Sequence, residues 1–122
     1  HCWQSIDRPE LVDELAKRVP AARVFVEVNI GEEPQKSGCA PDATGALVAR
    51  ATDSGLHVDG LMAVPPAASD PRPYFRSLRT LSERLGLPQL SMGMSGDFEV
   101  AIEEGATMVR IGSAVFGARQ AK

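Results

Sequence analysis

The sequence predicts an α/β protein in which parallel strands form a sheet with helices packed outside it. Segments with strand periodicity alternate with segments of helical periodicity along all 122 residues, giving a strand–helix unit repeated four times and then one more strand. The strand RVFVEVNI (23–30) is almost continuously apolar, as is typical of parallel strands buried on both faces. No linker or low-complexity tract divides the chain, so residues 1–122 are expected to form one domain or part of one.

The N-terminal half contains two of these predicted units. A short strand at 2–6 precedes a helix that Asp7 is expected to cap. The strand at 23–30 is followed by the polar loop GEEPQKSGCAPD and then by a helix over 41–53, which Gly55 closes.

The C-terminal half continues the alternation. Its predicted elements are, in order, a strand at 56–64, a helix from Tyr74 to Leu85, a strand at 88–95, a helix at 97–105 and a strand at 107–117. The first of these strands, LHVDGLMAV, is expected to break at Asp59–Gly60, and the amphipathic helix is expected to end near Gly86.

Charge and cysteine content exclude several classes of function. Acidic residues outnumber basic ones by 16 to 13 and no face collects Lys and Arg, so nucleic acid is not an expected partner. No apolar run reaches the ~20 residues of a membrane span, and no basic amphipathic helix suits a membrane surface. Cys2 and Cys39 form no CxxC pair, so we expect free thiols of a cytoplasmic protein rather than a zinc site.

The N-terminal residues HCWQSIDRPE lack an initiator methionine and open directly onto strand-like residues. They have neither the basic region nor the apolar region of a signal peptide. We therefore expect the chain to be part of a longer protein.

Two loops near the C-terminus have the composition of a phosphate site. In SMGMSGDFE, Gly93 and Gly96 leave the backbone bare between a strand and a helix, and Ser95 adds a hydroxyl. The free amides at the start of that helix are also expected to attract an anion. RIGSAVFG repeats the pattern with Gly112 and Ser113. Either loop alone fits an ordinary turn better, but the pair at the ends of consecutive strands favours a shared phosphate site.

Arg110 lies inside the apolar strand MVRIG, two residues before Gly112, so both are expected to project to the same side of the sheet. A guanidinium in such a place needs a partner because an unpaired buried charge is costly. A structural ion pair with Glu27 is one interpretation. A hydrogen bond to a ligand held at the phosphate loops is the other.

Two parallel architectures are compatible with these elements, an open doubly wound sheet and part of a (β/α)8 barrel. The dinucleotide-binding doubly wound sheet carries GxGxxG after an early strand, and this sequence has no such motif. In barrels, phosphate sites favour the loops after the last two strands, which is where the two predicted loops lie. Their position favours the barrel.

The segments SMGMSGDFEVAIEEGATMVRIGSAVFGAR, VEVNIGEEPQKSG and GLMAVPP resemble the pyridoxal phosphate homeostasis family, the YggS/PROSC type. The resemblance extends from QSIDR to FGAR, almost the whole chain. It implies a (β/α)8 barrel like the N-terminal domain of alanine racemase, of which this chain is the C-terminal part, about strands four to eight. It also implies a non-catalytic carrier or buffer of pyridoxal 5′-phosphate (PLP) in vitamin B6 homeostasis.

The resemblance also assigns cofactor-binding residues. Those expected at the phosphate are Ser95, Gly112 and Ser113, with backbone help near Gly93 and Met94. Arg110 is expected to face the pyridine nitrogen. Because an arginine does not accept a proton, that nitrogen stays unprotonated and the cofactor is a poor electron sink, which suits a binding protein.

The lysine that forms the family's Schiff base is absent, because it lies at the end of the first barrel strand, in a region that this sequence does not contain. Lys17 is predicted on a surface helix and Lys122 is terminal. Lys36 lies in the loop after the strand at 23–30, on the phosphate side, where a solvated charge is the simpler interpretation. We therefore expect no covalently bound PLP on this chain.

Two other functions stay open at this point. A PLP-dependent amino-acid racemase needs a tyrosine base from a second domain, whereas the single tyrosine here, Tyr74, is predicted on an outer helix. A phosphate-binding barrel unrelated to PLP would satisfy the two loops alone.

A partial barrel has open edges and an uncovered inner face, both of which favour pairing with another chain. We expect the 122 residues to self-associate or to pair with the missing N-terminal part. Because both phosphate loops are present, the chain is also expected to hold phosphate or sulfate between Ser95 and Ser113.

Overall fold

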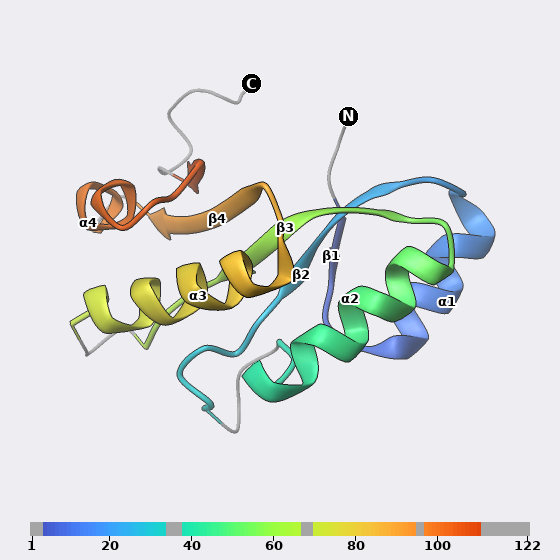
Figure 1. The fold of residues 1–122 in the computed structure, drawn as a ribbon, viewed down its shortest axis with the longest axis horizontal. Helices are drawn as coiled ribbons and strands as arrows, with labels where there is room; N and C mark the ends of the chain where they lie inside the picture. Colours follow the sequence, from blue (N-terminus) through green and yellow to red (C-terminus); the bar gives the residue numbers. More distant parts are fainter. Residues whose placement is uncertain (1–3, 34–37, 67–69, 95–96, 111–122) are drawn as a thin grey trace.

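The computed structural model describes residues 4–33, 38–66, 70–94 and 97–110 (Figure 1). Within these ranges strands and helices alternate as the sequence predicts. In chain order the elements are β1 (Gln4–Ile6), α1 (Pro9–Arg18), β2 (Arg23–Glu27), a 3₁₀ turn η1 (Pro41–Ala43), α2 (Thr44–Asp53), β3 (His57–Ala63), α3 (Arg72–Leu85), β4 (Gln89–Met94), α4 (Phe98–Glu103) and β5 (Met108–Arg110).

The strands form one parallel sheet in the order β1-β2-β3-β4-β5. Each described strand therefore pairs with its neighbour in sequence, and a helix connects each pair. The predicted parallel α/β sheet is therefore confirmed. A doubly wound sheet reverses its strand order at a switch point. No reversal occurs among the five described strands, so each new strand is added on the same side of the previous one.

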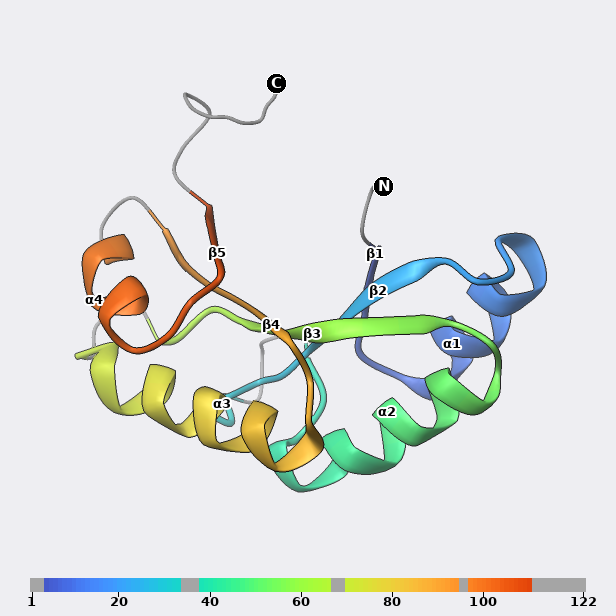
Figure 2. The ribbon, with the colours of Figure 1, turned by 45° about the horizontal axis from the view of Figure 1, so that its top comes forward.

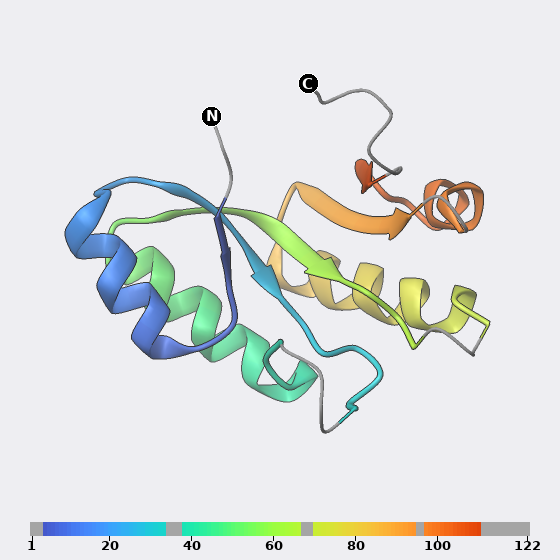
Figure 3. The same cartoon turned by 180° about the vertical axis from the view of Figure 1, so that it is seen from behind.

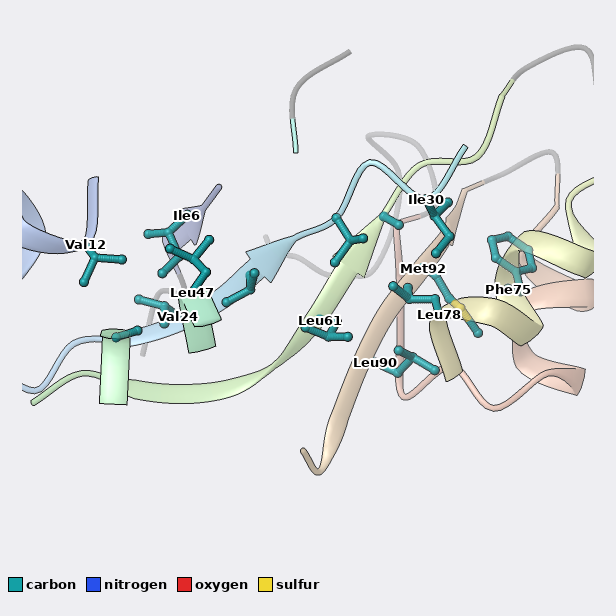
Figure 4. Close-up of a cluster of buried hydrophobic side chains, with 14 of the residues drawn as sticks. Ile6, Val12, Val24, Ile30, Leu47, Leu61, Phe75, Leu78, Leu90 and Met92 are labelled. Carbon is teal, nitrogen blue, oxygen red and sulfur yellow. The ribbon is translucent and has the colours of Figure 1, made fainter. Parts of the chain in front are cut away.

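The hydrophobic core lies between the sheet and the helices α1, α2 and α3, which all lie on one side of the strands (Figure 2). A row of paired residues crosses the sheet at its centre, formed by Ile6, Val26, Leu61 and Leu90. All four are buried, and Phe75 and Leu78 of α3 pack into the same cluster (Figure 4). Truncating a core residue such as Leu61 to alanine costs about 2–5 kcal/mol.

The opposite face of the sheet has no covering element among the described residues (Figure 3). Because side chains alternate along a strand, the next row of paired residues, with Glu27, Met62 and Ser91, points away from the helices. Ser5 reaches across this face, and its hydroxyl donates to Met62 Sδ at 2.9 Å. The uncovered face is therefore partly polar and carries a carboxylate.

The strand boundaries differ from the prediction at two places. β3 does not break at Asp59–Gly60 but continues through a bulge, because Val24 pairs with Val58 while Phe25 pairs with Gly60. Arg23 Nε donates to the carboxylate of the extra residue, Asp59, at 2.8 Å. The ion pair with Arg23 thus stabilises Asp59 at the bulge.

β2 ends earlier than the predicted 23–30. Its regular ladder stops at Glu27, and Val28 forms an isolated parallel bridge with Cys39. Cys39 N–H donates to the carbonyl of Glu27, and Asn29 N–H donates to the carbonyl of Cys39, both at 2.9 Å. The loop after β2 therefore folds back along its own strand.

The predicted N-cap role of Asp7 is wrong. Arg8 is the residue before α1, and no side chain caps that helix. The Asp7 carboxylate instead accepts hydrogen bonds from Arg8 Nε at 3.0 Å and from the backbone N–H of Gly38 at 3.1 Å. The helix end at Gly86 is as predicted, since Gly86 has the left-handed φ of 69° that favours glycine at a helix C-terminus.

Candidate functional site

The carboxyl ends of β4 and β5 meet at one edge of the sheet, and three of the predicted cofactor residues, Gly93, Met94 and Arg110, lie in these strands. The two strands are parallel, and Met94 pairs with Arg110 in their register. The carboxyl ends of the two strands therefore lie side by side. The pairing concerns the backbone of Met94 and Arg110, and their roles at a ligand stay predictions.

Gly93 precedes this edge in a conformation that favours glycine. Its φ is 102°, and the residue is buried. A residue with a Cβ costs roughly 1–2 kcal/mol in the left-handed region. The backbone of β4 therefore adopts, at Gly93, a conformation that residues with a side chain rarely adopt.

Several predicted residues lie outside the described ranges. These are Lys36, Ser95, Gly96, Gly112, Ser113 and Lys122. The helix after the first phosphate loop, α4, has only six residues, and Asp97 precedes it without a side-chain cap. Its short dipole adds little to anion binding.

The uncovered face continues to this edge. Glu27, Met62, Ser91 and Met108 share one row of the register, and Arg110 lies two residues beyond Met108, toward the carboxyl end of β5. Glu27 is half-buried, whereas the adjacent Val26 and Val28 are fully buried on the helical side. The predicted pairing of Glu27 with Arg110 stays a prediction, and the register places both residues near the carboxyl edge.

The base of the loop after β2 is held by a set of hydrogen bonds that the sequence did not reveal. Asn29 Nδ2 donates to the carbonyl of Glu33 at 2.6 Å, and its Oδ1 accepts from the N–H of Glu33 at 3.0 Å. Glu32, inside this turn, has a left-handed φ of 53°. An asparagine close to the end of a strand is the signal for such a turn, because its side chain hydrogen-bonds readily to nearby backbone.

Asp7 adds a contact from the neighbouring strand to the same loop. Partial burial alone would raise the pKa of Asp7, but the hydrogen bonds from Arg8 and from the N–H of Gly38 outweigh it and lower that pKa. Asp7 is therefore a carboxylate at neutral pH. The loop after β2 is thus held by a hydrogen bond to the residue that follows β1.

A groove of about 660 Å³ lies elsewhere, on the helical side between α2 and α3. Its walls include Ile30, Asp42, Thr80, Leu81 and Arg84. The described residues that line it include neither Gly93 nor any residue of β4 and β5. Gly93 and the paired ends of β4 and β5 lie at the edge of the sheet. We therefore place the candidate site at that edge and not in this groove.

Other polar side chains of the described ranges form no reactive centre. Those ranges contain no group of three or more His, Cys, Asp or Glu residues that would hold a metal ion. His57 is exposed at the start of β3. Cys39 is a free thiol whose pKa is raised by burial, and its Sγ lies 3.4 Å from Thr44 Oγ1. None of the described helices has the length and apolar character that a membrane span requires.

Comparison with known proteins identifies the relatives of this chain. The profile of the family described as alanine racemase, N-terminal domain, matches residues 1–120. The chain is 46% identical to the pyridoxal phosphate homeostasis protein of Aquifex aeolicus, over 95% of its own length and 57% of that protein. It is 42% identical to the protein of the same name from Pseudomonas aeruginosa, over 94% of its length and 54% of that protein. The chain thus spans about half the length of the curated relatives it matches.

Two solved structures superpose on most of this chain. A protein of unknown function from Bifidobacterium adolescentis is 33% identical and superposes with a TM-score of 0.81, over 93% of this chain and 51% of that one. PipY of Synechococcus elongatus, solved with PLP bound, is 27% identical with a TM-score of 0.76, over 94% of this chain and 60% of that one.

Proposed function

The chain belongs to the alanine racemase N-terminal domain family, and from that premise we propose that it is the C-terminal part of a PLP-binding barrel that acts in PLP homeostasis. One observation carries the proposal: the ends of β4 and β5 lie side by side, with Arg110 paired to Met94. Next to this pair is Gly93, which has a positive φ and no side chain. The names of its relatives and the PLP bound in PipY support the same ligand.

The order of the strands supports the barrel. Five parallel strands in sequential order with helices on one side are what strands four to eight of a (β/α)8 barrel provide. In the complete protein, the strands that precede this chain would pair with β1 on one side and with β5 on the other, and would cover the open face. They would also carry the lysine that binds PLP covalently, since this chain lacks the family's lysine-bearing strand.

The residues at the carboxyl edge receive separate roles. The hydroxyls of Ser95 and Ser113 and the backbone of Gly93, Met94 and Gly112 hold the phosphate. Gly93 fits this role because its buried backbone has no side chain to exclude an oxyanion. Arg110 donates a hydrogen bond toward the ring nitrogen and, as a permanent cation, does not accept a proton there.

The proposed protein is a carrier or buffer and not a catalyst. Bound PLP is a weaker electron sink when its ring nitrogen is unprotonated, and an arginine partner opposes protonation. Racemase chemistry also needs a base such as tyrosine at the cofactor. Tyr74 is half-buried on α3, on the helical side, away from the uncovered face.

Absorption spectroscopy of the complete protein tests this function. A visible band from bound PLP, together with no racemisation of amino acids, is the expected result. A protein that binds phosphate but shows no such band would favour a phosphate barrel unrelated to PLP. A protein with racemase activity would favour the enzyme.

A further inference from the structure

Glu104 is a nearly buried carboxylate at the end of α4, with only 6% of its surface exposed. Two arginines of α3 bind it: Arg72 Nη1 lies 2.5 Å from Oε2, and Arg76 Nε lies 3.0 Å from Oε1. Arg72 also donates to Glu103 at 2.7 Å. The hydrogen bonds from Arg76 and Arg72 lower the pKa of Glu104, so the cluster keeps its charge at neutral pH.

The turn that begins at Glu104 is fixed by its own backbone. Gly105 has a φ of 107°, and its N–H donates to the carbonyl of Ile102 at 3.1 Å. Ala106 N–H donates to the carbonyl of Ala101 at 2.9 Å, which completes the Schellman motif of a helix C-terminus. The chain therefore leaves α4 in one direction.

Thr107 joins the far end of this turn to β4. Its N–H donates to the carbonyl of Leu90 at 2.9 Å, and its Oγ1 accepts from the N–H of Leu90 at 2.8 Å. The segment 104–107 is thus held from two sides, by α3 through Glu104 and by β4 through Thr107. β5 begins at the next residue.

This anchoring sets the register of β5, because a strand advances by a fixed step of about 3.3 Å per residue. Met108 pairs with Ser91 and Arg110 pairs with Met94, so β4 uses three residues where β5 uses two and a register shift lies between the two pairs. A shift of one residue would move Arg110 to the other face of the sheet.

We propose that Glu104 is a positioning residue for the cofactor: by binding Arg72 and Arg76 it fixes the start of β5 and so holds Arg110 at the ligand. The inference rests on the proposed PLP function, since it acts through Arg110. The ion pairs of Glu104 with Arg72 and Arg76 would thus act on the cofactor indirectly, from the helical side of the sheet.

A double-mutant cycle in the complete protein tests whether Glu104 acts through Arg110. Glu104→Gln is expected to change the absorption spectrum of bound PLP, and to change nothing further when Arg110 is already glutamine. Thr107→Val, which removes the hydroxyl contact of the second anchor with Leu90, is expected to act in the same way. Additive spectral effects, or a parental spectrum in Glu104→Gln, would overturn the inference.

Asp13→Asn is the matched control. Arg50 Nη2 and Asp13 Oδ2 form a 2.6 Å ion pair between α1 and α2, remote from β5, so its loss is expected to leave the PLP spectrum unchanged. A spectral change of equal size in Asp13→Asn would show a general effect of lost ion pairs and overturn the inference.

Hydrogen exchange without cofactor separates this inference from the proposed function. Exchange of the amides at 108–110 is expected to speed up about tenfold in Glu104→Gln and not in Asp13→Asn. Unchanged exchange would overturn the positioning role even in a protein that binds PLP. Faster exchange in a protein that binds no PLP would overturn the proposed function instead.

Discussion

Asp7, at the end of β1, accepts a hydrogen bond from the backbone N–H of Gly38 over 3.1 Å, across 31 positions of the chain. The contact ties the first described strand to the loop after β2. Because the pKa of Asp7 is lowered in the folded protein, its charged form stabilises the fold.

This stabilisation has a defined pH dependence. It is fully present above the ordinary pKa of about 3.8 and is lost as the pH falls through the lower folded pKa. Asp7→Asn is expected to remove it and to cost about 1 kcal/mol of unfolding free energy at neutral pH. Urea denaturation between pH 2 and 7 measures both, with the exposed Asp42→Asn as control. A variant with the parental pH profile would contradict the assignment.

Arg110→Gln in the complete protein is expected to alter the spectrum of bound PLP while most of the binding remains. The proposed place of Arg110 is at the ring nitrogen, away from the phosphate. The substitution is therefore expected to change the electronic environment of the PLP ring more than the affinity of the protein for PLP. Absorption spectra at saturating PLP measure the change. Normal occupancy with an unchanged spectrum would place Arg110 elsewhere.

Ser95→Ala combined with Ser113→Ala is expected to weaken PLP by far more than it weakens unphosphorylated pyridoxal. Only PLP loses hydrogen bonds to a charged phosphate, which are about twice as strong as neutral ones. Titration of both ligands gives the comparison. Equal losses for the two would mean that the phosphate binds at another place.

Gly93→Ala is expected to cost roughly 1–2 kcal/mol of stability, because its φ of 102° is strained for any residue with a Cβ. It is also expected to weaken PLP, since the new methyl group narrows the approach to the backbone. Gly86→Ala is the matched control: it also has a positive φ, and an added Cβ there meets no atom within 4 Å. Equal PLP binding by both variants would remove Gly93 from the site.

The 122-residue chain by itself is expected to self-associate and to carry no covalent PLP. The described sheet has an uncovered face and unpaired edges at β1 and β5, which favour pairing with another chain. Light scattering at low micromolar concentration measures the association, and borohydride reduction followed by mass measurement detects a PLP adduct. A clean monomer would contradict the edge argument, and an adduct on Lys36 would show that this lysine substitutes for the missing one.

Local patterns in the sequence predicted most of the described fold. The periodicity of 23–30 and the glycine at Gly86 depend on neighbours in sequence, and both predictions hold within a few residues. The role of Asp7 was missed because its partner, Gly38, lies far along the chain and no local rule pairs them. The bulge at Asp59 was read as a strand break for the same reason, since Arg23 of another strand stabilises it.

For the candidate site, the sequence predicted the kinds of residue in the two loops but not how they are arranged in space. The glycines and serines of the two loops suggested a phosphate site, and the register of Met94 with Arg110 brings the strand ends together. Glu104 had no signal of its own, because a glutamate near a helix end is ordinary. Its importance depends on two arginines of α3 that fold back onto it.

The sequential strand order also bears on how the chain acquires its structure. Gln4 pairs with Val24, and Ser91 pairs with Met108, so each new strand joins a partner made shortly before it. Closing short loops costs little entropy, and contacts of small sequence separation form quickly. The sheet is therefore able to grow strand by strand during synthesis on the ribosome, with each βα unit docking onto the previous one as it emerges.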